Sequence, residues 1–123
     1  MQTDKLHGTI LFAQGSRDPL WRKPIEAVAA QVELISPTAH VRCAYLELTA
    51  PDLPTSAAEL VALGVGSITV VPMFLGVGKH AREDLPVLMS NLEISFPQIT
   101  FTLRPSIAEE SEVIEVMARI AIS

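Results

Sequence analysis

The stretch ITVVPMFLGVGKHAREDLP (residues 68–86) predicts a buried strand followed by a glycine-containing loop and a helix. Residues 68–74 are almost continuously apolar, which is typical of a strand buried on both faces of a sheet. Gly76 and Gly78 would allow the loop to turn tightly or to approach a ligand closely. Glu83 and Asp84 suit the first turn of a helix, which we expect over residues 82–92 with Pro86 near its beginning.

This loop also carries the residues with the clearest chemical potential, which are Lys79, His80 and Arg82. A neutral imidazole accepts a proton near pH 7 or binds a transition metal, and the flanking cations favour an anionic substrate. The alternative is a surface histidine without a role. The position after a buried strand leads us to favour a functional His80.

The rest of the chain repeats the same alternation of strand and helix. We expect further strands over residues 9–13, 40–48 and 99–103, and further helices over residues 19–35, 51–63 and from residue 106 onward. Four alternations predict a parallel sheet covered on both faces, within one α/β domain spanning residues 1–123.

Local patterns predict how two of these helices begin and pack. Asp18 is expected to cap the first helix with Pro19 at its first position, and Ser106 with Glu109 has the spacing of a capping box. An apolar stripe predicts the buried face of the first helix, which consists of Ile25, Val28, Ala29, Val32 and Ile35. A second stripe predicts the buried face of the last helix, which consists of Val113, Met117, Ile120 and Ala121.

Right-handed crossovers with helices on both faces require the strand order to reverse, and the common order is 2-1-3-4. Ligands of such sheets bind beyond the carboxyl ends of the strands at the reversal, here between the first and third strands. The flanking loops, residues 14–19 and 75–82, both carry basic side chains. Glu47 lies near the end of the second strand, where its carboxylate could face this crevice and transfer protons or attract a metal cation. The alternative is a carboxylate that faces solvent without a role.

Composition excludes several classes of protein. A net charge of −5 argues against broad nucleic-acid binding, and no apolar run reaches the roughly 18 residues of a membrane helix. The single cysteine, Cys43, and the absence of a signal-peptide pattern lead us to expect a cytoplasmic protein. Nucleophile-elbow, Walker and dinucleotide motifs are missing, so hydrolase, kinase and dehydrogenase functions lack support.

Three motifs together resemble the small, single-domain class II tetrapyrrole chelatases, the sirohydrochlorin cobaltochelatases and ferrochelatases of cobalamin and sirohaem synthesis. The resemblance covers nearly the whole chain and implies a chelatase-like (flavodoxin-like) three-layer fold. The matching residues are Gly15-Ser16-Arg17-Asp18-Pro19; Tyr45-Leu46-Glu47 with Pro51; and Pro72, Phe74, Leu75, Gly78, His80, Asp84 and Pro86.

The resemblance implies insertion of a divalent metal, Co²⁺ or Fe²⁺ and also Ni²⁺, into sirohydrochlorin or a related carboxylated tetrapyrrole. His80 and Glu47 would be the catalytic and metal-binding residues, with no cofactor beyond the substrate metal. Two subunits are expected to pair as a homodimer and complete the cleft. The substrate-binding residues would be Gln14, Gly15, Ser16, Arg17, Gly78, Lys79 and Arg82.

One position departs from the family pattern, because Gln14 stands where the first motif normally has histidine. Glutamine neither takes up a proton at neutral pH nor binds Co²⁺ or Fe²⁺ strongly. A non-catalytic tetrapyrrole or metal carrier of the same fold is therefore the alternative function. A small-anion-binding flavodoxin-like module is a third.

Overall fold

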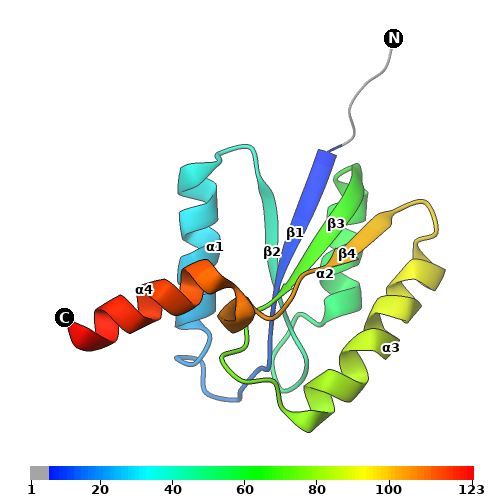
Figure 1. Cartoon of the computed structure of the whole chain (residues 1–123). Coiled ribbons are helices and arrows are strands. Elements are labelled where there is room, and N and C mark those ends of the chain that lie inside the picture. The colour runs from blue at the N-terminus through cyan, green and yellow to red at the C-terminus, as the bar shows by residue number, and fades with distance from the viewer. Residues whose placement is uncertain (1–5) are drawn as a thin grey trace.

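The computed structural model describes residues 6–123, and its strands form one parallel sheet in the order β2-β1-β3-β4 (Figure 1). The predicted α/β class, parallel pairing and 2-1-3-4 order are confirmed. The strands are β1 (Leu6–Ala13), β2 (His40–Tyr45), β3 (Val65–Pro72) and β4 (Thr100–Leu103).

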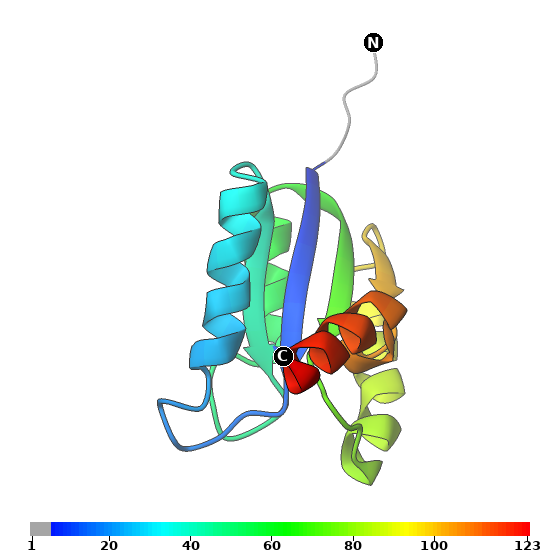
Figure 2. The ribbon, with the colours of Figure 1, turned by 60° about the vertical axis from the view of Figure 1, so that its left-hand side comes forward.

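Helices lie on both faces of this sheet (Figures 1 and 2). On one face α2 and α3 enclose the hydrophobic core against β1 and β3, whose fully buried side chains include Ile10, Phe12, Ile68 and Val70. On the opposite face α1 lies beside β2 and β1. The helical elements are α1 (Lys23–Ile35), α2 (Leu53–Ala62), α3 (Lys79–Ser95), the short 3₁₀ helix η1 (Ile107–Glu109) and α4 (Ser111–Ile122).

The predicted start of the first helix is wrong, because α1 begins at Lys23 rather than at Pro19. The Asp18 carboxylate accepts a hydrogen bond from the Leu20 amide at 2.9 Å, and the Asp18 carbonyl accepts one from Trp21 at 3.0 Å. These bonds close a turn that delays the helix. Asp18 therefore stabilises the loop rather than the helix.

The predicted start of the third helix is also wrong, since α3 begins at Lys79 with Gly78 as its N-cap. The Arg82 amide already donates to the Gly78 carbonyl at 3.1 Å, which completes the first turn. Consequently His80 lies in the first helical turn instead of the loop, and Pro86 lies inside the helix rather than near its beginning.

The capping box predicted at Ser106 does not form. The Ser106 hydroxyl is buried and donates to the Phe74 carbonyl at 2.7 Å, so it anchors the chain after β4 to the chain after β3.

The helix α4 starts at Ser111, and neither α1 nor α4 contains a buried residue. The apolar stripe expected on α1 is only partly buried, because Ile25, Ala29 and Val32 are partly buried while Val28 and Ile35 are exposed. Of the stripe expected on α4, only Val113 is partly buried, and Met117, Ile120 and Ala121 are exposed.

The loops that follow β1 and β2 are joined by backbone contact. Strand pairing continues past both strand ends, because the Leu46 amide donates to Ala13 at 2.9 Å and the Glu47 amide donates to Gln14 at 3.1 Å. Gly15 has a φ of +96°, and a Cβ atom there would collide with the Glu47 carbonyl oxygen. The strand predicted to reach residue 48 ends at Tyr45, since the chain turns at Leu48, whose φ is +65°.

Alanine substitutions at three glycines separate backbone strain from steric collision. Gly64 has a φ of +97° but open space around it, so Gly64→Ala should cost about 1–2 kcal/mol of unfolding free energy. Gly15→Ala adds the collision with the Glu47 backbone and should cost roughly 2 kcal/mol more. Urea unfolding measures these differences. The control Gly76→Ala, with no such φ and nothing nearby, should change stability by less than about 0.5 kcal/mol; equal losses at Gly15 and Gly64 would contradict the proposed contact.

Asp52 caps α2, because its Oδ1 accepts a hydrogen bond from the Thr55 amide at 2.9 Å. The hydrogen bonds from Thr55 lower the pKa of the Asp52 carboxyl. Asp52→Ala should therefore reduce the unfolding free energy by about 1 kcal/mol at pH 7.

The charge-dependent part of this stabilisation is full above the carboxyl's unfolded pKa and disappears as pH falls through its lower folded value. Urea unfolding at pH 7 and at acidic pH should show that the difference in unfolding free energy between wild type and Asp52→Ala becomes smaller in acid. Asp52→Asn, which keeps a capping oxygen, should retain most of the stability at pH 7. A gap between wild type and Asp52→Ala that is unchanged in acid would refute the role of the charge.

Candidate functional site

The carboxyl edge of the sheet brings Gln14 and Glu47 into direct contact. The Gln14 side-chain amide donates to Glu47 Oε1 at 2.8 Å. Gln14 directly follows β1 and Glu47 is the second residue after the neighbouring strand β2, and the backbone bonds between their loops fix the pair. Gln14 is half-buried and Glu47 is exposed, so the carboxylate remains open to a ligand.

The next residues along the first loop hold it against the second. The Ser16 amide donates to Thr49 Oγ1 at 3.1 Å, and the Thr49 hydroxyl donates back to the Ser16 carbonyl. This reciprocal pair holds the loops together after Gly15, and the bonds between Gln14 and Glu47 hold them together before it. Nothing in the sequence motif singled out Thr49, because its role depends on the position of a loop 33 residues away.

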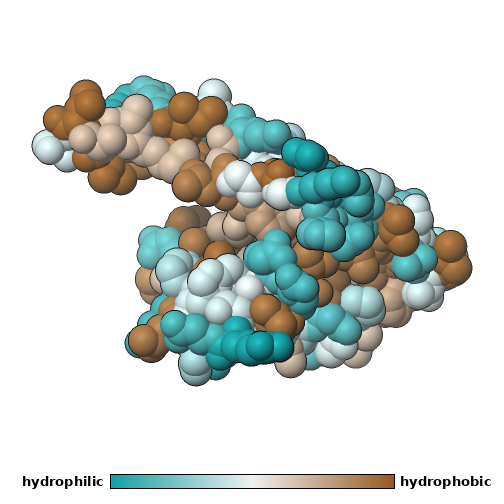
Figure 3. Space-filling model, turned by 90° about the horizontal axis from the view of Figure 1, so that it is seen from below, coloured by the Kyte–Doolittle hydropathy of each residue, from teal (hydrophilic) through white to brown (hydrophobic). Residues whose placement is uncertain are grey.

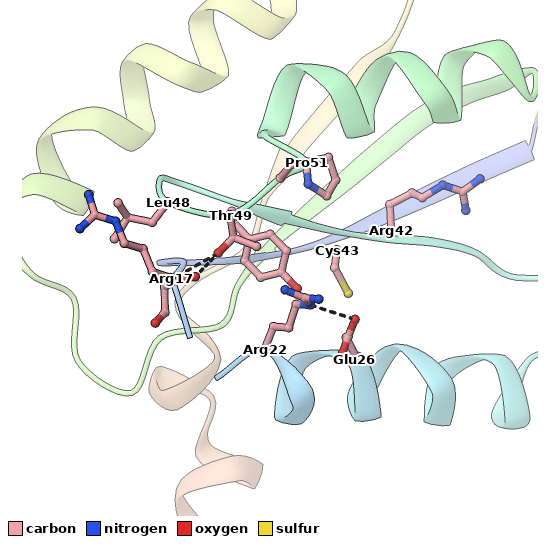
Figure 4. A pocket seen from close by; sticks show the side chains of 11 residues that line it. Arg17, Arg22, Glu26, Arg42, Cys43, Leu48, Thr49 and Pro51 are labelled. Atoms are coloured by element: carbon pink, nitrogen blue, oxygen red, sulfur yellow. Dashed lines mark hydrogen bonds and ion pairs between the residues drawn. The ribbon is translucent and has the colours of Figure 1, made fainter. Parts of the chain in front are cut away.

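Ser16 and Arg17 line a cavity of about 610 Å³ beside the edge strand β2 (Figure 4). Arg22 and Arg42 line it too, each paired with a carboxylate: Arg22 with Glu26 at 3.5 Å, and Arg42 with Glu59 at 3.0 Å. Within residues 6–123 Arg17 forms no ion pair, and Figure 4 shows its guanidinium pointing away from the other two. Arg17 is therefore available to an anionic ligand.

Cys43 and Tyr45 also line this cavity, but neither is poised for reaction. Burial raises the pKa of the Cys43 thiol, and it raises the pKa of the Tyr45 phenol to about 12. Both groups are thus protonated and uncharged at neutral pH. The Tyr45 ring packs edge-on against Trp21 with ring centroids 6.2 Å apart, so Tyr45 forms part of the cavity wall.

The first turn of α3 presents Lys79 and His80 to solvent. Lys79 lies 3.9 Å from Glu83 in a loose ion pair. Gly78 has an extended backbone and open space around it, so no turn requires glycine there, whereas Gly15 is required by its φ and its contact. Arg82 donates to the Val77 carbonyl at 3.3 Å and lines a separate cavity of about 380 Å³ under α3.

The predicted site residues therefore share one edge of the sheet without forming one pocket. Glu47 lines a cavity of about 390 Å³ formed by residues 45–52 and Thr55. This cavity adjoins that of Arg17, with which it shares the wall formed by Tyr45 and residues 48–51, but it shares no lining residue with the cavity of Arg82. In the described part of the chain, no hydrogen bond or ion pair joins His80 to Glu47. Among the same residues, no group of three or more His, Cys, Asp or Glu side chains is placed to hold a metal ion.

Two exposed leucines belong to this edge, namely Leu75, which is part of the motif around His80, and Leu48, which no sequence pattern indicated. Leu75 is 79% exposed in the loop before α3, and Leu48 is 55% exposed in the loop after β2. Large apolar side chains at a ligand edge offer contact area to a ligand with an apolar face.

Among the described helices, none has the length and apolar character that spanning a membrane requires.

Comparisons with known proteins connect this geometry to a family. The family model CbiX matches residues 8–122. The chain is 32% identical over 80 residues to the sirohydrochlorin cobaltochelatase of Methanopyrus kandleri, a match that covers 65% of this chain and 56% of that relative. The chain thus matches little more than half the length of this curated relative.

Two solved structures have the same fold. The first is a cobalamin biosynthesis CbiX protein from Marinobacter aquaeolei VT8, which superposes on this chain with a TM-score of 0.81. The two chains are 31% identical, and the match covers 94% of this chain and 91% of the other. The sirohydrochlorin chelatase SirB of Bacillus subtilis subspecies spizizenii, in complex with cobalt, has a TM-score of 0.78 at 23% identity, covering 94% of this chain and 50% of that one. With a family match over nearly its full length and the expected parallel sheet, the chain belongs to the CbiX family of class II chelatases.

Proposed function

We propose that this protein inserts a divalent metal ion into sirohydrochlorin or a closely related carboxylated tetrapyrrole. The observation that carries the proposal is the exposed Glu47 carboxylate, fixed at the carboxyl edge of a CbiX-family sheet beside Gln14. The first turn of α3, with His80, follows the neighbouring strand to the same edge. Co²⁺, Fe²⁺ and Ni²⁺ are the candidate substrate metals, and no further cofactor is required.

Metal insertion replaces two pyrrole N–H protons with one M²⁺ ion, so the site must attract a cation and accept protons. Glu47 supplies a carboxylate for the cation or for a released proton. His80 supplies an imidazole, which binds transition metals and accepts protons near neutral pH. These two residues are the proposed catalytic and metal-binding groups.

The substrate's acidic arms require cations and amide donors around the same edge. Arg17, Lys79 and Arg82 are exposed and provide the positive charge. Guanidinium groups bind carboxylates through paired hydrogen bonds, and the lysine ammonium adds a point charge. The backbone of Gly15, Ser16 and Gly78 lies next to these cations along the chain. The exposed side chains of Leu48 and Leu75 offer apolar area to a flat ring.

Gln14 holds the Glu47 carboxylate in place rather than replacing the missing imidazole. Its amide donates to Oε1 and has no proton-accepting nitrogen. This contact favours a second candidate, a carrier that binds the tetrapyrrole or the metal without inserting it. Binding and turnover must therefore be measured separately.

One chain offers few metal-binding groups, which supports a pairing of two copies. Protein sites for transition metals commonly use three or four ligands, more than the described residues of one chain bring together. The cobalt-bound SirB chain is about twice as long as the part that this chain matches. We therefore include a homodimer in the proposal, with one edge from each copy facing the ligand.

Metal insertion is tested by mixing the purified protein with sirohydrochlorin and Co²⁺, Fe²⁺ or Ni²⁺ and following the absorption of the macrocycle. His80→Ala should lower the rate by roughly 10²–10⁴-fold, because it removes a proton acceptor and metal ligand. The matched control is His40→Ala, since His40 begins β2 at the opposite edge of the sheet. A wild-type rate equal to the protein-free rate with all three metals would refute the enzymatic proposal.

The role of Gln14 is tested by restoring the family residue. Gln14→His should raise the insertion rate of an active enzyme, because a second imidazole joins the edge beside Glu47. Fluorescence titration with sirohydrochlorin measures binding independently of turnover. Tight binding without insertion by the wild type would favour the carrier, and insertion gained only by Gln14→His would identify the glutamine as its cause.

A further inference from the structure

Tyr45 is a buried residue whose hydroxyl lacks a hydrogen-bond partner among nitrogen and oxygen atoms. The residue is only 2% exposed. Within residues 6–123 its hydroxyl makes no side-chain hydrogen bond to nitrogen or oxygen, and its one contact of this kind is with the weakly bonding Cys43 thiol. Buried hydroxyls are normally paired, because an unpaired one loses its hydration without compensation. The Tyr45 hydroxyl is therefore left to donate to a ligand.

This hydroxyl faces the cavity of about 610 Å³ beside β2, not the adjoining cavity of Glu47. In the described part of the chain no fully buried side-chain nitrogen or oxygen lacks a partner, so solvent must reach this hydroxyl. Burial does most to raise the pKa of Tyr45 to about 12, while Glu26 raises it further and Arg22 opposes the rise. Glu26 and Arg22 line only the larger of the two cavities. The hydroxyl and the Arg22 guanidinium thus share one hollow.

Arg22 offers this cavity a full set of donors. A guanidinium carries five N–H groups, and none of those on Arg22 makes a hydrogen bond within residues 6–123. Its ion pair with Glu26, 3.5 Å from Nε to Oε2, is loose and half-exposed. Such pairs contribute little energy, so Arg22 can turn toward an anion at small cost. Arg42 differs, because it already donates to Glu59 at 3.0 Å and to the Val41 carbonyl at 2.9 Å.

The N-terminus of α1 adds positive potential at the same wall. Arg22 is the N-cap residue of this 13-residue helix, and no side chain caps the helix by a hydrogen bond. The amides at a helix N-terminus carry a partial positive charge that favours anions, phosphate groups among them. The cavity therefore combines an uncapped helix start, an unpaired hydroxyl and an available guanidinium.

These donors match a phosphate group better than a carboxylate. Arg22 supplies parallel N–H groups that bind two oxygens, and Tyr45 supplies a third donor from a different element. A phosphate monoester has three terminal oxygens and a carboxylate has two. A volume of about 610 Å³ lies within the roughly 300–1,000 Å³ of small-molecule sites, which leaves room for an organic group.

The position of the cavity separates it from the proposed tetrapyrrole site. In Figure 4 Arg22 and Cys43 lie between Arg17 at one end of the cavity and Arg42 at the other. At about 3.3 Å per residue, Arg42 lies roughly 15 Å from Glu47 along the strand direction. A flat macrocycle seated over Glu47 would leave the part of the cavity beside Cys43 and Arg22 unfilled.

We propose that this cavity binds the phosphate group of a second small ligand, either inorganic phosphate or a phosphate monoester, through the Arg22 guanidinium and the Tyr45 hydroxyl. Arg17 remains with the tetrapyrrole, since its guanidinium points away from Arg22 and Arg42. The phosphate site does not depend on metal insertion.

Binding can be followed through Trp21, the only tryptophan of the chain, because its ring packs against Tyr45 at 6.2 Å between centroids. The full chain is titrated with inorganic phosphate, glycerol 3-phosphate and acetate, against potassium chloride at matched ionic strength. Calorimetry of the same solutions measures binding independently of fluorescence. We expect saturable binding of the phosphate compounds, and the tighter of the two identifies a free or an esterified ligand. No saturable binding by either method, or acetate binding as tightly as phosphate, would overturn the proposal.

Two variants test the proposed donors. Tyr45→Phe and Arg22→Gln should each weaken phosphate binding about 10–100-fold, as expected for a lost hydrogen bond to a charged group. The matched control is Arg119→Gln, which removes another Arg–Glu pair of the same spacing on α4, the arm that projects from the body in Figure 3. It should leave the affinity unchanged. Unaltered binding by Tyr45→Phe and Arg22→Gln would refute the assignment.

Urea unfolding without ligand separates binding from a structural role of the hydroxyl. Tyr45→Phe should be at least as stable as the wild type, because the lost hydroxyl has no nitrogen or oxygen partner. A clear loss of stability would show that the hydroxyl supports the fold and would contradict the proposal.

Sirohydrochlorin distinguishes the phosphate site from a socket for an acidic arm of the macrocycle. Saturating phosphate should not displace sirohydrochlorin, and Tyr45→Phe should bind it as the wild type does. Mutual displacement would assign the cavity to the macrocycle and overturn the separate site. Phosphate binding by a protein that inserts no metal would leave this proposal standing, and insertion without phosphate binding would leave only the proposed function.

Discussion

The contact between Gly15 and the Glu47 carbonyl is the constraint on which the site depends. It requires a backbone that only glycine adopts easily, and it leaves no room for a side chain between the two loops. Because the loops approach this closely, strand pairing extends beyond β1 and β2, and Gln14 reaches Glu47. The Ser16–Thr49 pair then holds the same contact from the other side. A carboxylate that would otherwise end a strand in solvent thereby acquires a defined position.

The long-range architecture could be predicted from the sequence because it depends on repeated, redundant features. Four apolar runs separated by helical patterns leave few arrangements, and right-handed crossovers select among them. Helix starts were less predictable. Asp18 and Ser106 both have capping chemistry, yet Asp18 closes a turn and Ser106 bonds to Phe74, a residue 32 positions away. A capping residue offers the same hydroxyl or carboxylate to any nearby partner, and tertiary structure decides which partner is present.

The positions of the candidate site residues could be predicted to the level of the sheet edge but not to the level of contacts. The strand order places the loops of Gln14 and Glu47 and the first turn of α3, with His80, at one edge, as the topology required. It does not determine side-chain distances, because those depend on where α3 begins and on how the Glu47 loop turns at Leu48. Thr49 and Leu48 could not be predicted for the same reason. Neither has a distinctive pattern, and their positions follow from the backbone geometry of the loop after β2.

The candidate site and the exposed helix α4 are connected by one segment of the chain, the segment between β4 and α4. Arg104 and Ser106 anchor the chain at the carboxyl edge, the edge that holds Gln14 and Glu47, and α4 departs from there.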